Sequence, residues 1–124
     1  MKGMFALAVA AGALLAGGTV AQASHAHVGS AQKPALIKTV NVTASEFKFV
    51  LSAKSAKRGV VIFKVKNVGK LAHDFQINGR KTPLIDPGKS NTLRVTFLKK
   101  GAYPYKCTVP GHAAAGMKGV FTIS

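Results

Sequence analysis

Apolar and polar residues alternate with a period of two along most of the chain after Pro34. Seven segments show this alternation or are rich in β-branched and aromatic residues, and turn signals built on Gly, Pro and Asn separate them. The segments are 37–43, 47–52, 60–67, 73–78, 92–98, 103–107 and 118–123. No segment has a sustained helical period, and 52–58 has room for a turn or two of helix at most. We therefore expect an all-β fold, a Greek-key β-sandwich of about seven to eight strands, with a small barrel as the alternative.

The alternation also places three chemically distinctive side chains on one kind of face. His73, Cys107 and Met117 each lie at the end of a predicted strand, with the parity of that strand's apolar residues. Those apolar residues are Phe75 and Ile77, Tyr103 and Tyr105, and Phe121 and Ile123, respectively. If the apolar face is the core face, the three side chains point inward at the same end of the sandwich.

The first 23 residues have the features of a secretory signal peptide. Lys2 gives a positively charged start, 5–16 is an apolar run, and 21–23 (Ala-Gln-Ala) offers the small-x-small pattern that signal peptidase cleaves. The alternative is a retained membrane anchor, but 5–21 is short for a membrane span and contains three glycines. We expect cleavage after Ala23 and export to the periplasm. We also expect a flexible leader over 24–34 and one domain over 35–124.

Charge limits the partners of this domain. The chain has 124 residues, with 18 Lys and Arg against 3 Asp and Glu, and its formal charge of +15 falls to +14 when Lys2 leaves with the signal peptide. Because 48% of the residues are hydrophobic, a folded domain is favoured over a disordered polycation. A basic protein can bind nucleic acid, an anionic membrane surface or an acidic protein. Export argues against nucleic acid.

The single cysteine, Cys107, excludes an intramolecular disulfide and zinc modules built on several cysteines. An exported thiol is exposed to oxidation unless something occupies it, although an inert buried cysteine is the common case. Cys107 begins a C-x4-H-x4-M pattern that continues through His112 to Met117, and His73 comes from an earlier strand. Two imidazoles, a thiolate and a weak axial thioether are the ligand set of type-1 copper.

Each of these residues also has a simpler explanation. His73 alone fits a core histidine, Met117 fits core filling, and His112 fits an exposed loop. Cys107 and His112 together fit a nucleophile pair. Such a pair needs an acidic residue to orient its histidine, and none is evident, because Asp74 is the one carboxylate near any of the candidate ligands in sequence. Zinc gains nothing from a thioether and binds such sites less tightly than Cu(II). The four residues together therefore indicate one copper ion.

The loop sequence resembles that of a known family. Residues 105–112 (Tyr-Lys-Cys-Thr-Val-Pro-Gly-His), continued by 117–119 (Met-Lys-Gly), are similar to the copper loop of the cupredoxins. Its composition resembles azurin and its spacing the auracyanin type, and 72–75 resembles the family's first-histidine motif. The resemblance implies a Greek-key sandwich with one type-1 copper. It also implies that His73, Cys107 and His112 are strong ligands and Met117 is the weak axial ligand.

Three departures from the family pattern concern the surroundings of the metal. Asp74 stands where the family usually has Asn; its carboxylate can accept hydrogen bonds from N–H groups near Thr108, but it adds negative charge beside copper. We therefore expect a lower reduction potential than in an Asn variant. Ala72 stands where azurin has Gly, and azurin's structural disulfide cannot form with one cysteine.

These observations predict an electron-transfer protein that shuttles single electrons between redox partners through Cu(I) and Cu(II). The alternative is a periplasmic copper-handling protein without a carrier role. Such a protein favours an exchangeable site with several Met or His ligands, whereas Met117 is the one methionine left after cleavage. We expect no enzyme activity, because a nitrite-reductase-like enzyme needs a second copper domain that the 101 residues after Ala23 cannot hold.

We expect the partner to be an acidic redox protein, such as a cytochrome or a copper enzyme. His112 is the candidate for an exposed ligand edge, and the small apolar residues of 109–115 around it suit brief docking. Basic residues near the ligands in sequence would steer such a partner, unless the charge is only a solvated surface. They are Lys70, Arg80, Lys81, Lys106 and Lys118. We expect a monomer, and contact with a membrane surface is not predicted.

The leader holds a second candidate copper site. Cleavage after Ala23 would leave a free amine beside His25 and His27, a set of nitrogen ligands suited to weak Cu(II) binding. Two solvated histidines in a leader are the more common case.

Overall fold

The computed structural model describes residues 36–124. The expected signal peptide, the leader over 24–34 and its histidines His25 and His27 lie outside the described residues. The described part of the chain contains nine strands and no helix, and therefore no helix that could cross a membrane. The strands are β1 (Ile37–Ser45), β2 (Lys48–Leu51), β3 (Ser55–Ala56), β4 (Gly59–Asn67), β5 (Gln76–Ile77), β6 (Arg80–Lys81), β7 (Ser90–Phe97), β8 (Gly101–Lys106) and β9 (Lys118–Ile123).

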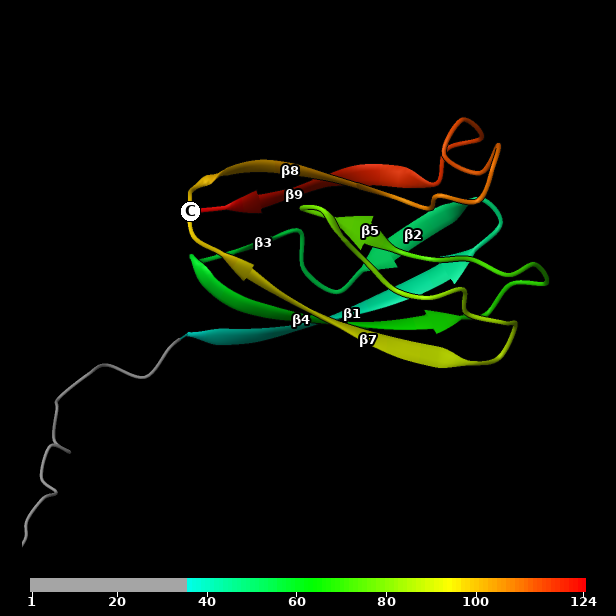
Figure 1. Cartoon of the computed structure of the whole chain (residues 1–124), viewed down its shortest axis with the longest axis horizontal. Helices are drawn as coiled ribbons and strands as arrows, with labels where there is room; N and C mark the ends of the chain where they lie inside the picture. The colour runs from blue at the N-terminus through cyan, green and yellow to red at the C-terminus, as the bar shows by residue number, and fades with distance from the viewer. Residues whose placement is uncertain (1–35) are drawn as a thin grey trace, which may run out of the picture. The chain divides into compact units, whose positions relative to one another are not determined.

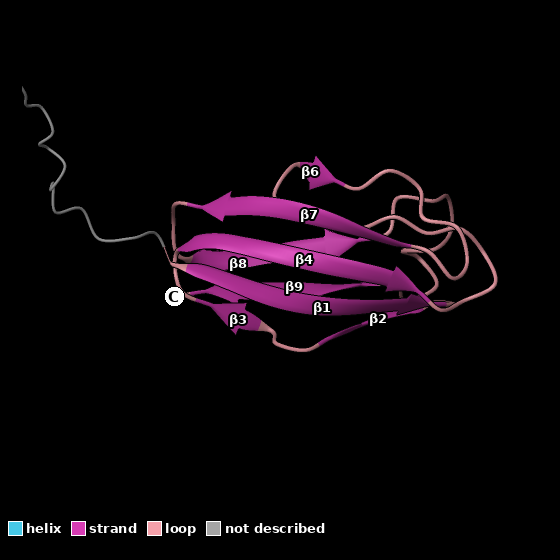
Figure 2. Ribbon diagram, turned by 90° about the horizontal axis from the view of Figure 1, so that it is seen from below, coloured by secondary structure: helices cyan, strands magenta, loops and turns pink. Residues whose placement is uncertain are grey.

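The strands form two sheets that pack face to face (Figures 1 and 2). One sheet has the order β2-β1-β4-β7, and the other has the order β3-β9-β8-β5-β6. Pairing is parallel between β1 and β4 and between β3 and β9, and antiparallel elsewhere. The chain passes repeatedly from one sheet to the other, as in a Greek-key sandwich. The predicted all-β sandwich is confirmed.

The strand count exceeds the prediction because two strands of only two residues each, β3 and β6, lie outside the seven predicted segments. One of them, β3, occupies part of 52–58, where the sequence left room for a turn of helix. Segment 73–78 is a strand only in β5, because His73 and Phe75 pair with the incoming loop instead: His73 bridges Ile85, and the N–H of Thr82 donates to the carbonyl of Phe75. A tight turn with positive φ at Asn78 and Gly79 then leads from β5 into β6.

Aromatic side chains fill the space between the sheets. Phe63 of β4 lies with its ring centroid 5.1 Å from that of Phe75 and 5.3 Å from that of Phe121, and Phe97 packs beside them. All four rings are at most 1% exposed. Burying a side chain of this size stabilises the fold by about 1.5–3 kcal/mol. These rings set the distance between the two sheets. They thereby set the positions at which the loops leave the ends of the strands.

The predicted faces are correct. Leu93, Val95 and Phe97 of β7 are buried, and so are the inward residues of the other strands. His73, Cys107 and Met117 are at most 1% exposed, and each lies where its strand or strand-like segment meets the loops at one end of the sandwich.

Candidate metal centre

The loops at one end of the sandwich carry the four residues that the sequence singled out. His73 lies in the segment between β4 and β5, Cys107 follows β8, and Met117 precedes β9, with His112 on the turn between the last two (the orange loop of Figure 1). Backbone hydrogen bonds close this turn, from the N–H of Cys107 to the carbonyl of Met117 and from the N–H of Met117 to the carbonyl of His112, both at 3.1 Å. The loop that joins the end of β8 to the start of β9 is therefore held as one unit.

Three donor atoms form a small triangle. Nδ1 of His73 lies 3.1 Å from Nδ1 of His112, and Sγ of Cys107 lies 3.9 Å from the first and 3.6 Å from the second. A point equidistant from the three atoms lies about 2.1 Å from each, which is close to metal–nitrogen and metal–sulfur bond lengths. All three residues are buried. The three donors are therefore close enough together to hold one metal ion between them.

Met117 completes the soft donor set. Its side chain is fully buried, and its backbone is bonded to both Cys107 and His112. Two imidazoles and a thiolate, with the thioether of Met117 as the predicted fourth donor, fit a metal that alternates between Cu(I) and Cu(II). The role of Met117 as the weak axial ligand stays a prediction.

Residues 26–124 match the family described as copper binding proteins, plastocyanin/azurin family. The chain belongs to this cupredoxin family. Together with the donor set, this membership identifies the cofactor as a single type-1 copper ion.

Relatives and solved structures agree with this assignment. The chain is 27% identical over 161 aligned positions to the copper-resistant cuproprotein CopI of Pseudomonas aeruginosa, covering 86% of this chain and 89% of CopI. The fold matches auracyanin from Roseiflexus castenholzii with a TM-score of 0.61 and 20% identity, covering 73% of this chain and 99% of that one. It also matches the blue copper oxidase of Nitrosomonas europaea with a TM-score of 0.60 and 16% identity, covering 72% of this chain but only 39% of the oxidase. These structural likenesses show the fold.

The surroundings of Cys107 control its protonation in this cupredoxin. Burial raises the pKa of the Cys107 thiol, more than hydrogen bonding to its neighbours lowers it. Without metal, the thiol is therefore protonated at neutral pH. Cys107 would hold copper as the thiolate, so copper binding would release that proton.

Asp74 ties the two ligand segments together. Its Oδ1 accepts a hydrogen bond from the backbone N–H of Thr108 at 2.6 Å, and its Oδ2 accepts one from the Thr108 hydroxyl. This contact allows Asp74 to be only 3% exposed although its parity places it opposite His73 and Phe75. The expected hydrogen bond from the N–H of Thr108 is confirmed.

Sequence reasoning missed two residues of the turn between β1 and β2. Oε2 of Glu46 lies 2.9 Å from Nε2 of His73, and the ring of Phe47 packs edge-on against His112 with centroids 5.0 Å apart. The hydrogen bond from His73, followed by that from the N–H of Lys70, lowers the pKa of Glu46. A signal did exist, because Glu46 is one of only three acidic residues in a strongly basic chain.

Asn67 is a third residue that was missed. It is fully buried at the end of β4, where its Nδ2 donates to the carbonyls of Leu71 and Ile85 at 2.7 and 2.8 Å. Its Oδ1 accepts the N–H of Gly69 at 2.8 Å. Asn67 thereby shapes the segment that leads to His73, and the Asn-x-Gly pattern after a strand was the available signal.

The surface at this end is apolar, as the sequence predicted, but His112 is more covered than expected. Only 8% of His112 is exposed, because Phe47 packs against it. Loops of the same end add exposed apolar side chains at Phe47, Leu71 and Leu84. The exposed apolar surface at this end is therefore wider than the loop 109–115.

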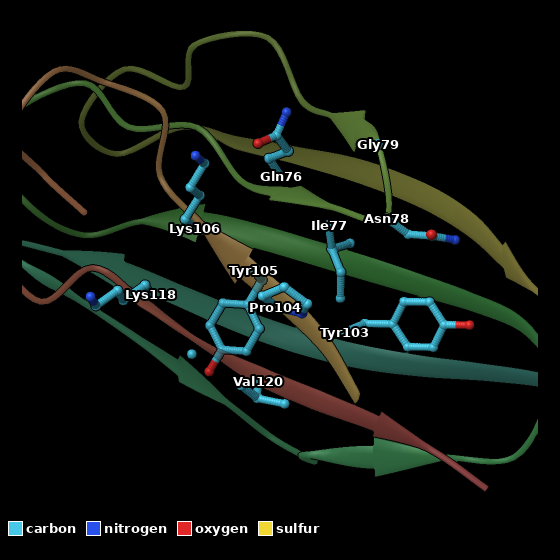
Figure 3. Close-up of a pocket in the computed structure, with 11 residues that line it drawn as sticks. Gln76, Ile77, Asn78, Gly79, Tyr103, Pro104, Tyr105, Lys106, Lys118 and Val120 are labelled. Carbon is cyan, nitrogen blue, oxygen red and sulfur yellow. The ribbon is translucent and has the colours of Figure 1, made fainter. Parts of the chain in front are cut away.

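A groove of about 740 Å³ crosses the outer face of β8 and β9 (Figure 3). Tyr103 lies toward one end of the groove, Pro104 and Val120 lie in its middle, and Lys106 and Lys118 lie toward the other end. These two lysines adjoin Cys107 and Met117 in sequence, so positive charge flanks the metal centre on this side.

Proposed function

We propose that this cupredoxin is an exported electron carrier that passes single electrons between redox proteins. The buried triangle of His73, Cys107 and His112 donors carries the proposal. Copper supplies a one-electron Cu(I)/Cu(II) couple when bound.

The protein frame supports this role in two ways. Backbone hydrogen bonds join Cys107, His112 and Met117 within one loop, and Asp74 ties that loop to the segment of His73. We therefore expect the ligands to keep their positions when the charge of the metal changes. With Met117 as the fourth ligand, the side chains leave no open position for a substrate. A rigid, closed site favours electron transfer over catalysis.

Surface features support brief docking of an acidic partner. Phe47 packs against His112, Leu71 and Leu84 add exposed apolar side chains on the loops, and Lys106 and Lys118 adjoin Cys107 and Met117 in sequence. Small apolar contacts allow fast release, and positive charge raises the association rate with acidic proteins. We propose a periplasmic monomer that meets an acidic cytochrome or copper enzyme. The signal-peptide pattern of residues 1–23 supports export.

The deciding experiment is the addition of Cu(II) to the purified mature protein, residues 24–124. We expect an intense blue colour that disappears with ascorbate and returns with an oxidant over many cycles. Cys107→Ser serves as the control and should lose the colour while keeping the β fold by circular dichroism. A copper complex of the unmodified chain that is colourless, or that does not cycle, would reject the carrier function.

The relative CopI, described as a copper-resistant cuproprotein, favours copper handling as the second candidate. This role requires copper to leave the site for another molecule. Transfer of Cu(I) to bathocuproine disulfonate measures that release. Release within seconds at neutral pH would favour copper handling, whereas release over hours with fast electron exchange would favour the carrier.

A further inference from the structure

Glu46 pairs with a buried histidine and not with a lysine or arginine. The chain has 18 Lys and Arg residues, yet among residues 36–124 the single salt-bridge contact of Glu46 is to His73, at 2.9 Å. The side chain of His73 is 1% exposed and that of Glu46 is 23% exposed. The contact therefore lies at the buried edge of the metal centre and not on the open surface.

Both carboxylate oxygens of Glu46 are used. Oε1 accepts the backbone N–H of Lys70 at 2.6 Å, and Oε2 faces Nε2 of His73. A carboxylate accepts hydrogen bonds, so Nε2 of His73 carries the proton and Nδ1 carries the lone pair. That Nδ1 is the atom that belongs to the donor triangle with Cys107 and His112.

Gly69 provides the space for this contact. A Cβ on Gly69 would lie 1.8 Å from Oε2 of Glu46, so a side chain at position 69 and the present carboxylate position exclude each other. The φ of Gly69 is not in the positive range that requires glycine. Space for the Glu46 carboxylate, and not backbone conformation, is therefore the reason for glycine here.

We propose that Glu46 is the positioning residue for His73. Its carboxylate holds the imidazole in the Nε2–H tautomer and turns Nδ1 toward copper, and Gly69 admits the carboxylate. This inference rests on the proposed function only in taking His73 as a copper ligand. A carboxylate behind a ligating histidine fixes its orientation and increases its basicity.

The first test uses the metal-free protein and reads the tautomer directly. Two-bond ¹H–¹⁵N correlations at about pH 8, above the ordinary histidine pKa, distinguish Nδ1–H from Nε2–H. We expect His73 of the unmodified chain to be the Nε2–H form, and Glu46→Ala to give a mixture. Gly69→Ala should give a similar mixture with the carboxylate still present, because it displaces only the flexible end of Glu46.

A second test reads the copper-loaded protein. Removing an outer partner of a ligating histidine typically costs about 10–100-fold in metal affinity, and we expect that loss for Glu46→Ala. Glu46→Gln should recover part of the lost affinity, because its amide oxygen can still accept a hydrogen bond from Nε2 of His73. The amide has only one oxygen, so it cannot replace both carboxylate oxygens, and the bond from the N–H of Lys70 is lost. Asp86→Asn is the charge control, since it removes the same charge from an exposed loop and should leave the affinity within about twofold.

The outcomes separate this inference from the proposed function. An unchanged His73 tautomer in both Glu46→Ala and Gly69→Ala would overturn the positioning role, whatever the redox behaviour of the copper protein. If Glu46→Ala does not fold, Gly69→Ala alone decides. A changed tautomer in a protein whose copper does not cycle would support the positioning role and reject the carrier.

Discussion

Asp74 and Thr108 form a double hydrogen bond between the two segments that carry the predicted copper ligands. Thr108 follows Cys107, Asp74 follows His73, and both carboxylate oxygens of Asp74 are occupied by the N–H and hydroxyl of Thr108. The contact serves the structure by locking the ligand loop to the first histidine. It also places a nearly buried negative charge next to two ligands.

The first prediction separates the two effects of Asp74. In Asp74→Asn, the amide oxygen can still accept the N–H of Thr108, and the amide nitrogen can donate to the hydroxyl, so the tie remains. Loss of the charge should raise the reduction potential, because Cu(I) carries less positive charge than Cu(II). A unit charge at short range is worth about 1–2 kcal/mol, which for one electron corresponds to tens of millivolts. Spectroelectrochemical titration measures the potential, and an unchanged value would contradict the prediction. Asp86→Asn is the exposed-charge control and should change it less.

The fold and the clustering of the candidate donor residues could be predicted because both have local signals. Period-two alternation assigns faces without knowledge of the partner strand, and Cys107, His112 and Met117 lie within one loop of the sequence. Glu46 could not be placed in this way, since its contact to His73 spans 27 positions and depends on how β1 and β4 pair. A glutamate in a turn usually faces water, so the rarity of acidic residues in this chain marks Glu46 out but does not name His73 as its partner.

The second prediction concerns Asn67, whose side chain replaces missing backbone pairing. Asn67→Ala removes three hydrogen bonds and leaves the carbonyl of Leu71 and the N–H of Gly69 without these partners. We expect the free energy of unfolding of the metal-free protein to fall by about 2–4 kcal/mol, measured by urea denaturation. Asn91→Ala is the matched control, because the side chain of Asn91 bonds only the adjacent N–H of Thr92 at an exposed site. Similar losses in both variants would show that Asn67 has no special role.

The third prediction is a loss of stability of the metal-free protein at alkaline pH. The pKa of Cys107 is raised in the folded state, so above the ordinary thiol pKa of about 8.5 the unfolded chain loses a proton that the folded chain keeps. Ionisation of the thiol then lowers the free energy of the unfolded state relative to that of the folded state. The free energy of unfolding therefore falls as the pH rises toward the folded pKa, by at most about 1.4 kcal/mol per pH unit for this group.

Chemical denaturation under reducing conditions tests the effect of the thiol by difference. Cys107→Ser should show a flatter dependence on pH between about 8.5 and 10 than the unmodified chain. Burial also raises the pKa of Tyr105, so Tyr105→Phe should flatten the curve further, but only above about pH 10. Parallel curves for the unmodified chain and Cys107→Ser would show that the thiol does not ionise differently in the two states.

The last prediction concerns the positive charge beside the metal centre. Lys106 and Lys118 lie next to copper ligands in sequence and at one end of the groove, whereas Lys64 and Lys66 lie exposed on β4 of the other sheet. The double variant Lys106→Glu with Lys118→Glu should slow oxidation of the Cu(I) protein by hexacyanoferrate(III), a trianion, severalfold at low ionic strength. The matched variant Lys64→Glu with Lys66→Glu changes the net charge equally, so it should slow the reaction less if location matters. Stopped-flow measurement should also show the difference shrinking above about 0.15 M salt, where the Debye length falls to about 8 Å. Equal rates for the two variants at every ionic strength would mean that the charge acts only as a diffuse whole and steers no partner toward the copper end.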